Sequence, residues 1–208
     1  HDEKDFTAQV MAHRWIPGES DSDYKESVNP SDSHVSWDVS GVYKLNDDVN
    51  VFARVANSFR APSIQGRVLY QAPDEQFISV ADSETTNSFE TGIKSDVLDG
   101  RGRVNATVYY FEMQDQQLTA VGGETNSNTL LNADKTVGYG FELDTQWILT
   151  DEINASFNIS YNSTEIQDEG LSVATCGSST CTVTDPLNEN GQAVIDGNSL
   201  PNSPEWIA

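Results

Sequence analysis

The chain has 208 residues, of which 33 are acidic and 11 are basic, so its formal net charge is -22 at pH 7. A surface this acidic repels phosphate, which argues against nucleic acid as a partner. Mean hydropathy is -0.49, and no apolar run approaches the ~20 residues that a membrane helix needs. A transmembrane β-barrel is compatible with these totals, because only alternate residues of its strands contact lipid.

Strand-like runs follow one another along most of the chain. They cover residues 5–15, 35–45, 49–59, 84–97, 103–118, 135–149 and 153–166. In the last run Ile153, Phe157 and Tyr161 share one face, while Asn154 and Asn158 share the other, which is the period of two of a half-buried strand. Such runs exceed the ~5–6 residues usual in soluble proteins and suffice for the ~9–11 residues that cross a bilayer.

The connections between these runs alternate between short and long. The short ones are 46–48, 99–102 and 150–152, and the long ones are 16–34, 60–83, 119–134 and 167–203. Because successive antiparallel strands reverse direction, all short connections lie at one end of the strands. Short periplasmic turns and long extracellular loops are typical of outer-membrane β-barrels. An eighth strand is expected to begin near residue 203.

Charged side chains occupy the polar faces of the predicted strands. Five of them fall at positions that alternate with apolar residues: Arg54, Glu90, Lys94, Glu142 and Asp144. In a large barrel the apolar face contacts lipid and the polar face lines the interior. We therefore expect these five side chains to point into the lumen, where simple solvation is the alternative to a specific contact.

Two cysteines, Cys176 and Cys181, lie close together in the longest predicted loop. A disulfide between them requires an oxidising compartment such as the periplasm or cell surface, and closing so small a ring stabilises by roughly 2 kcal/mol. A metal site would need further Cys or His ligands nearby, so none is predicted. The three histidines are unclustered and no catalytic constellation is evident, so the chain is not expected to be an enzyme.

Several stretches resemble the barrel of TonB-dependent outer-membrane receptors. They are 50–63 with its Phe-Arg-Ala-Pro ending, 84–95 with Glu-x5-Glu-x-Gly-x-Lys, 104–111, 138–144, and 200–206 with Leu-Pro-x-x-Pro. The resemblance implies an all-β, antiparallel barrel segment of about 7–8 strands within a barrel of about 22 strands. Residues 1–208 would form one partial barrel domain from the C-terminal half, without the plug domain, the TonB-contacting segment or the closing strand.

The resemblance also implies a function. Such a receptor takes up a scarce nutrient through the outer membrane of a Gram-negative bacterium, with a ferric siderophore or another metal chelate as the expected ligand. Its partners would be the TonB complex, its own plug domain against the five lumen-facing residues, and lipid, and no cofactor is implied. The candidate ligand-facing residues lie in the long connection 60–83, together with the connection 119–134: Arg60, Arg67, Tyr70, Gln71 and Phe77. Both arginines would suit an anionic chelate, or would pair with acidic loop residues.

Two other interpretations stay open at this point. A passive, porin-like barrel would show the same alternation of short and long connections, and a plug-length region in the parent protein would argue against it. A soluble β-sheet surface or glycan-binding module would also expose one polar face. An apolar face that carries Val137, Phe141 and Phe157 argues against the soluble module, unless a second sheet covers that face.

Overall fold

The computed structural model describes residues 1–11, 23–65, 78–122, 127–175 and 183–208. These residues form strands, turns and irregular segments. None of the described segments is a helix long and apolar enough to cross a membrane.

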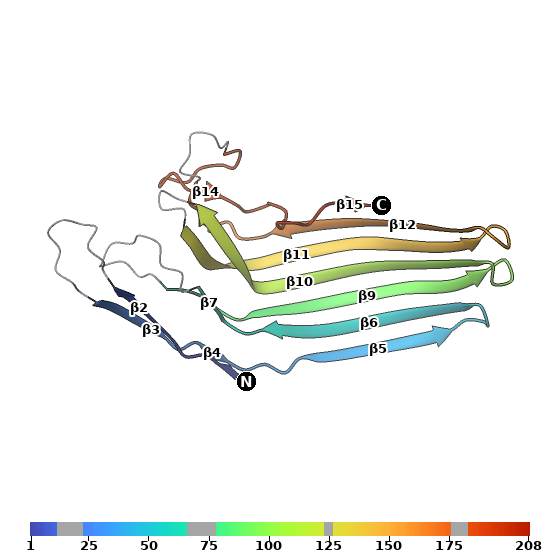
Figure 1. Ribbon diagram of the computed structural model, residues 1–208, viewed down its shortest axis with the longest axis horizontal. Helices are drawn as coiled ribbons and strands as arrows, with labels where there is room; N and C mark the ends of the chain where they lie inside the picture. The colour runs from blue at the N-terminus through green and yellow to red at the C-terminus, as the bar shows by residue number, and fades with distance from the viewer. Residues whose placement is uncertain (12–22, 66–77, 123–126, 176–182) are drawn as a thin grey trace.

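One antiparallel sheet dominates the structure (Figure 1). It has seven strands in the order β15-β12-β11-β10-β9-β6-β5. Their bounds are β5 (Trp37–Lys44), β6 (Val49–Arg60), β9 (Glu84–Val97), β10 (Gly102–Gly122), β11 (Ser127–Ile148), β12 (Asn154–Ile166) and β15 (Trp206–Ile207). Six predicted runs therefore form the long strands, and the predicted eighth strand is present as β15, which pairs with β12.

The short connections all lie at one end of this sheet, which we call the turn end (right in Figure 1). In the turn between β9 and β10, Leu98 and Asp99 each have a φ of 54° and Gly100 a φ of 81°. Left-handed conformations of this kind suit Gly and are tolerated by Asp. The long connections leave from the opposite end, which we call the loop end. The predicted alternation is confirmed.

The described part of the first predicted run does not join this sheet, so the expectation that it lies in the barrel wall is wrong for these residues. Its described part forms β2 (Phe6–Met11), which pairs with β3 (Asp23–Val28) in a separate two-stranded sheet. β1 (Asp2–Glu3) pairs likewise with β4 (Ser31–Asp32). Alternation could not reveal these partners, because a period of two is the same whichever strand lies alongside.

The predicted connection 119–134 is largely strand as well. β10 and β11 stay paired as far as Gly122 and Ser127, although β9 stops pairing with β10 at Gln114. We call the part of this hairpin formed by residues 116–122 of β10 and 127–133 of β11 the ribbon. Both strands bend where the ribbon leaves the sheet (Figure 1), and Asp115 there has a φ of 54°.

Short strand pairs also interrupt the other long connections. β7 (Ser63–Gln65) pairs with β8 (Ser79–Ala81), and β13 (Ser172–Val173) pairs with β14 (Ala193–Val194). The buried apolar side chains of the described residues gather at the loop end. They include Ile78, Ala81, Ala133 and Ile166. The small hydrophobic core of the described residues therefore holds the ribbon and the 60–83 connection together.

The main sheet presents one polar and one apolar face. Apolar side chains stay exposed along its length, for example Val39 at 65%, Val108 at 51% and Phe157 at 53%. Among the described strands no second sheet packs against them. A soluble module would need a second sheet to cover this face. The part of the chain that the structure describes contains no such sheet.

Candidate functional site

The cross-strand register relates the five candidate lumen residues to one another. Arg54 lies opposite Glu90, and Lys94 lies opposite Asn105, which in turn lies opposite Asp144. Side chains of directly paired residues point to the same side of an antiparallel sheet. Glu142 is two residues from Asp144 on the same strand, so all five share the polar face.

Charges on this polar face are linked across neighbouring strands. The Arg54 guanidinium places Nη2 2.5 Å from Asp38 Oδ2 and Nη1 4.0 Å from Glu90 Oε2. The ammonium of Lys94 lies 5.4 Å from the centre of the Phe52 ring, within the range of a cation–π contact. Because the three ion-paired side chains are substantially exposed, we expect these contacts to orient the arginine more than to stabilise the fold.

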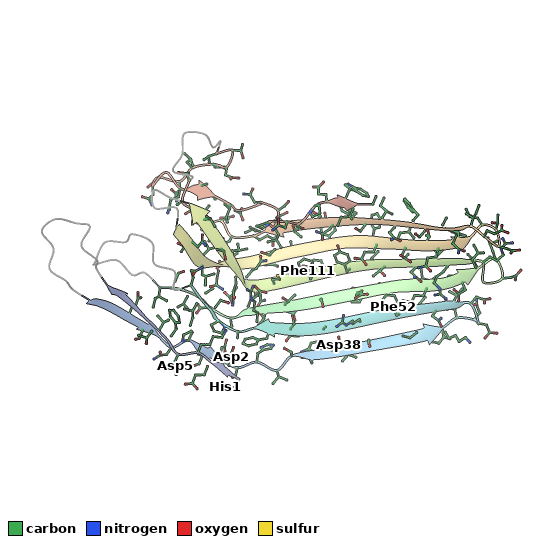
Figure 2. The ribbon with its side chains drawn as sticks, in the orientation of Figure 1. His1, Asp2, Asp5, Asp38, Phe52 and Phe111 are labelled. Atoms are coloured by element: carbon green, nitrogen blue, oxygen red, sulfur yellow. The ribbon has the colours of Figure 1, made fainter. Side chains whose placement is uncertain are left out.

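Aromatic rings lie flat over glycines on the same face (Figure 2 labels two of them, Phe52 and Phe111). A Cβ at Gly92 would meet the Phe52 ring at 2.7 Å, and one at Gly138 would overlap the Phe111 ring. The Tyr109 ring covers Gly140, and its hydroxyl donates to Asn162 Oδ1 on the next strand at 2.9 Å. The three consecutive aromatics at 109–111 obscure the alternation in the sequence, and the register resolves them, with only the central ring on the apolar face.

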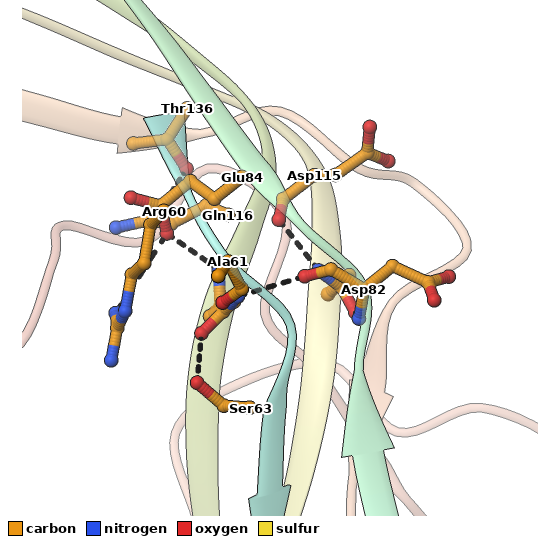
Figure 3. Close-up of polar contacts among 10 residues, drawn as sticks. Arg60, Ala61, Ser63, Asp82, Glu84, Asp115, Gln116 and Thr136 are labelled. Carbon is orange, nitrogen blue, oxygen red and sulfur yellow. Dashed lines mark hydrogen bonds and ion pairs between the residues drawn. The ribbon is translucent and has the colours of Figure 1, made fainter. Parts of the chain in front are cut away.

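A second polar cluster lies at the loop end (Figure 3). The hydrogen bonds of Gln117 of β10 connect it. Only 7% of Gln117 is exposed. Its Nε2 donates to the carbonyl oxygens of Ala61 and Asp82, both at 2.9 Å. Its Oε1 accepts a hydrogen bond from Ser63 Oγ at 2.5 Å. One neutral side chain therefore contacts both ends of the 60–83 connection.

Arg60 belongs to the same cluster, through a carboxylate. The backbone N–H of Gln117 donates to Glu84 Oε2 at 2.8 Å, and Arg60 Nη1 lies 3.9 Å from that oxygen. The Glu84 side chain is 13% exposed, whereas that of Arg60 is 60% exposed. The backbone of Arg60 pairs with that of Glu84 and one guanidinium nitrogen lies near this carboxylate, while the largely exposed side chain keeps the cation accessible to an anion.

Asn132 of β11 closes the cluster from the other strand of the hairpin. Its Nδ2 donates to the carbonyl oxygens of Asp82 at 3.1 Å and Asp115 at 2.6 Å. Its Oδ1 accepts the backbone N–H of Asp82 at 2.8 Å. Farther along the ribbon, the N–H of Leu130 donates to Ser79 Oγ at 2.9 Å.

The N-terminal segment adds two contacts at this end of the sheet. Lys4 Nζ donates to the carbonyl oxygen of Pro62 at 2.6 Å. Ser83 Oγ donates to Asp32 Oδ2, and the Ser33 N–H donates to the other carboxylate oxygen at 2.7 Å. The Ser83 hydroxyl and then the Ser33 amide hold the pKa of Asp32 below its usual value, because both favour the ionised carboxylate.

Several predicted site residues lie outside the described residues. These are Arg67, Tyr70, Gln71, Phe77, Cys176 and Cys181. Sequence reasoning treated Glu84 only as the first residue of the 84–95 motif, and it missed Gln117 and Asn132, because a neutral amide within a strand carries no signal of its own. Within the described ranges, His, Cys, Asp and Glu side chains form no group of three or more that could hold a metal ion.

Comparison with known proteins agrees with this architecture. Residues 13–208 match the family described as TonB dependent receptor-like, beta-barrel. The chain therefore belongs to the TonB-dependent receptor barrel family.

Individual relatives show how much of such a protein the chain represents. It is 29% identical over 127 residues to the probable TonB-dependent siderophore receptor PiuA of Acinetobacter baumannii, a match that covers 61% of this chain and 15% of PiuA. The ferric yersiniabactin uptake receptor FyuA of Yersinia pestis superposes with a TM-score of 0.61 and 18% identity, over 89% of this chain and 24% of FyuA. The ferric-catecholate import receptor Fiu of E. coli K12, in its closed form, gives 0.58 and 13%, over 98% of this chain and 27% of Fiu.

Proposed function

We propose that this chain forms part of the barrel wall of an outer-membrane receptor for TonB-dependent uptake of a ferric siderophore or another metal chelate. The observation that carries the proposal is a family-matched sheet with one charged face and one exposed apolar face. All three relatives are named as receptors for siderophores or ferric chelates, which supports the cargo class. Receptors of this family are transport proteins rather than enzymes.

The height of the apolar face supports a place in a bilayer. On β11 the outward positions run from Val137 to Trp147, opposite apolar residues of β10 such as Val108 and Ala106. The ten steps between them, at ~3.3 Å each and tilted by ~40°, rise about 25 Å along the membrane normal. That height equals the apolar band of outer-membrane barrels. In this arrangement the turn end faces the periplasm and the loop end faces the exterior.

The partners follow from this orientation. Lipid covers the apolar face, and the polar face with Arg54, Glu90, Lys94, Glu142 and Asp144 packs against the plug domain of the parent receptor. TonB acts on that parent through a region that the chain does not cover. At the loop end the exposed guanidinium of Arg60 contacts an anionic chelate, together with Arg67, Tyr70, Gln71 and Phe77, because guanidinium forms strong charge-assisted bonds to carboxylate and catecholate oxygens.

Uptake by the full-length parent receptor tests this proposal. Iron-starved cells would be given the ferric complex of a tris-catecholate or of a tris-hydroxamate, with TonB present or deleted. We expect TonB-dependent uptake of one chelate class. Arg60→Ala should weaken binding of that complex about tenfold, or about 1.4 kcal/mol.

The matched control is Arg101→Ala. Arg101 lies at the turn end, where its Nη2 donates to the carbonyl oxygens of Ile148 and Leu149 at 3.1 Å each, so its loss should leave chelate binding unchanged. Uptake that ignores TonB, together with open-channel conductance in planar bilayers, would instead identify a passive barrel.

A further inference from the structure

The loop-end contacts join two segments that are distant in sequence, and the side chain of Gln117 bonds to both ends of the 60–83 connection. We propose that Gln117 is a positioning residue that makes the two described ends of the 60–83 connection, residues 60–65 and 78–83, move with the ribbon as one unit. A chelate that engages Arg60 then also restrains the ribbon. The ligand's arrival at Arg60 rests on the proposed function, whereas the mechanical link is a property of this chain alone.

The first support is that Gln117 has its hydrogen-bonding groups engaged. Both Nε2 protons go to carbonyl oxygens, of Ala61 and Asp82, and Oε1 accepts from Ser63. With 7% of the residue exposed, water has little access to replace a lost bond. Removing the amide takes the side-chain donor from the Ala61 carbonyl and one of two side-chain donors from the Asp82 carbonyl, so the connection should open locally.

The second support is that these bonds reach both ends of the connection. Ala61 and Ser63 stand at its start, and Asp82 stands at its end. Asn132, from the partner strand of the ribbon, bonds to the backbone of Asp82 twice. Its Oδ1 accepts the Asp82 N–H, and its Nδ2 donates to the Asp82 carbonyl oxygen. Neither end of the connection can shift without disturbing a bond to the ribbon.

Glu84 connects Gln117 to the exposed guanidinium of Arg60. Glu84 Oε2 accepts the backbone N–H of Gln117 at 2.8 Å and faces Arg60 Nη1 at 3.9 Å. When the guanidinium turns toward an anionic ligand, its attraction to Glu84 weakens. The carboxylate that accepts the Gln117 N–H at the start of the ribbon is therefore the same one that a movement of Arg60 would affect.

The pairing of the ribbon allows it to move separately from the main sheet. Beyond Gln114 it has left its pairing with β9, and Asp115 at the bend has a φ of 54°. Among the described strands, the ribbon residues 116–122 pair only with β11. A pivot at residue 115 therefore moves the ribbon without breaking the ladder of the main sheet.

The neighbouring residue Gln116 supplies a matched control. It is 8% exposed, and its Oε1 accepts a hydrogen bond from Thr136 Oγ1 at 2.5 Å. That bond stays within the β10–β11 hairpin and does not reach the 60–83 connection. Gln116 and Gln117 are thus alike in type, burial and position, and they differ in the segment that they contact.

Amide hydrogen exchange of the full-length receptor in lipid nanodiscs tests the link. Gln117→Glu keeps the size and the acceptor oxygen but removes both donors, and Gln117→Leu removes every side-chain bond. In both variants we expect residues 61–65 and 79–84 to exchange about tenfold faster than in the wild type, because local opening sets that rate. Gln116→Glu and Gln116→Leu should accelerate exchange only within the hairpin.

Adding the ferric tris-catecholate complex as a probe tests the coupling. In the wild type it should protect both 61–65 and the ribbon, and in Gln117→Glu it should protect 61–65 alone. The proposal is overturned if the Gln116 and Gln117 variants give the same exchange pattern, or if the probe still protects the ribbon in Gln117→Glu. A wild type that the probe does not protect contradicts the proposed ligand class, while the ligand-free comparison still decides the link.

Discussion

At the scale of single residues, the polar wall is shaped by glycines that lie beneath aromatic rings. Tyr109 and Phe111 stack 6.5 Å apart with an interplanar angle of 9°, and they cover Gly140 and Gly138 of the next strand. A ring over glycine restores packing that the missing side chain would otherwise leave open. The rings therefore lie close to the sheet on the polar face, which leaves space above them inside a barrel.

Gly140→Val tests this packing. A Cβ at position 140 would overlap the Tyr109 ring and the carbonyl oxygen of Tyr161, so the ring must leave and its bond to Asn162 is lost. We expect a loss of about 1–3 kcal/mol, measured by urea unfolding of the refolded receptor in detergent. Gly41→Val on β5 is the control, since nothing lies within 4 Å of its added Cβ. Equal losses in both variants would contradict the packing argument.

At the scale of elements, the ribbon shows how pairing overrides composition. Residues 119–134 are rich in Thr, Asn and Gly, which is the composition of a loop. The structure nevertheless pairs Thr119 with Leu130 and Val121 with Asn128. Cross-strand bonds within a hairpin, and contacts between β11 and β8 such as the Leu130 N–H to Ser79 Oγ bond, stabilise strand geometry that residue preferences alone disfavour.

Asp115→Val tests the bend that releases the ribbon. A β-branched residue is strained at a φ of 54° by about 1–2 kcal/mol, so the ribbon should open more often and be cleaved faster by protease added to intact cells. Asp115→Gly should be cleaved no faster than the wild type, because glycine adopts this φ without strain. Thr119→Val, within the ribbon, is the matched control. Cleavage that is equally fast in the two valine variants would show that the bend is not responsible.

At the scale of the whole molecule, stability depends on what surrounds the sheet. Many of its large side chains on the apolar face are exposed, and the buried apolar side chains of the described residues lie at the loop end. Among the described strands, β5 and β15 each pair on one side only. Unpaired backbone cannot persist in lipid, so in a membrane both edges require neighbouring strands of the parent barrel.

Neighbouring residues of β10 test the orientation of the sheet in the bilayer. Val108, opposite Phe141, lies on the apolar face, and Thr107, opposite Glu142, lies on the polar face. We expect Val108→Arg to destabilise the receptor by about 2–4 kcal/mol, as an arginine does at the bilayer midplane, and Thr107→Arg to cost far less. Urea-dependent folding into phospholipid vesicles measures both, and the reverse order would mean that the faces are assigned the wrong way round.

The sequence by itself determined the strand periods, the alternation of connections, the two faces of the sheet and the family. These are local properties, because a period of two and a turn motif are patterns of consecutive residues. Only the tertiary structure decided that 6–11 pairs with 23–28, that β10 and β11 extend into a ribbon, and that Gln117 joins it to the 60–83 connection. Each of these depends on contacts between residues far apart in the chain, and the partner of a strand or of a buried amide is set by packing, which alternation does not encode.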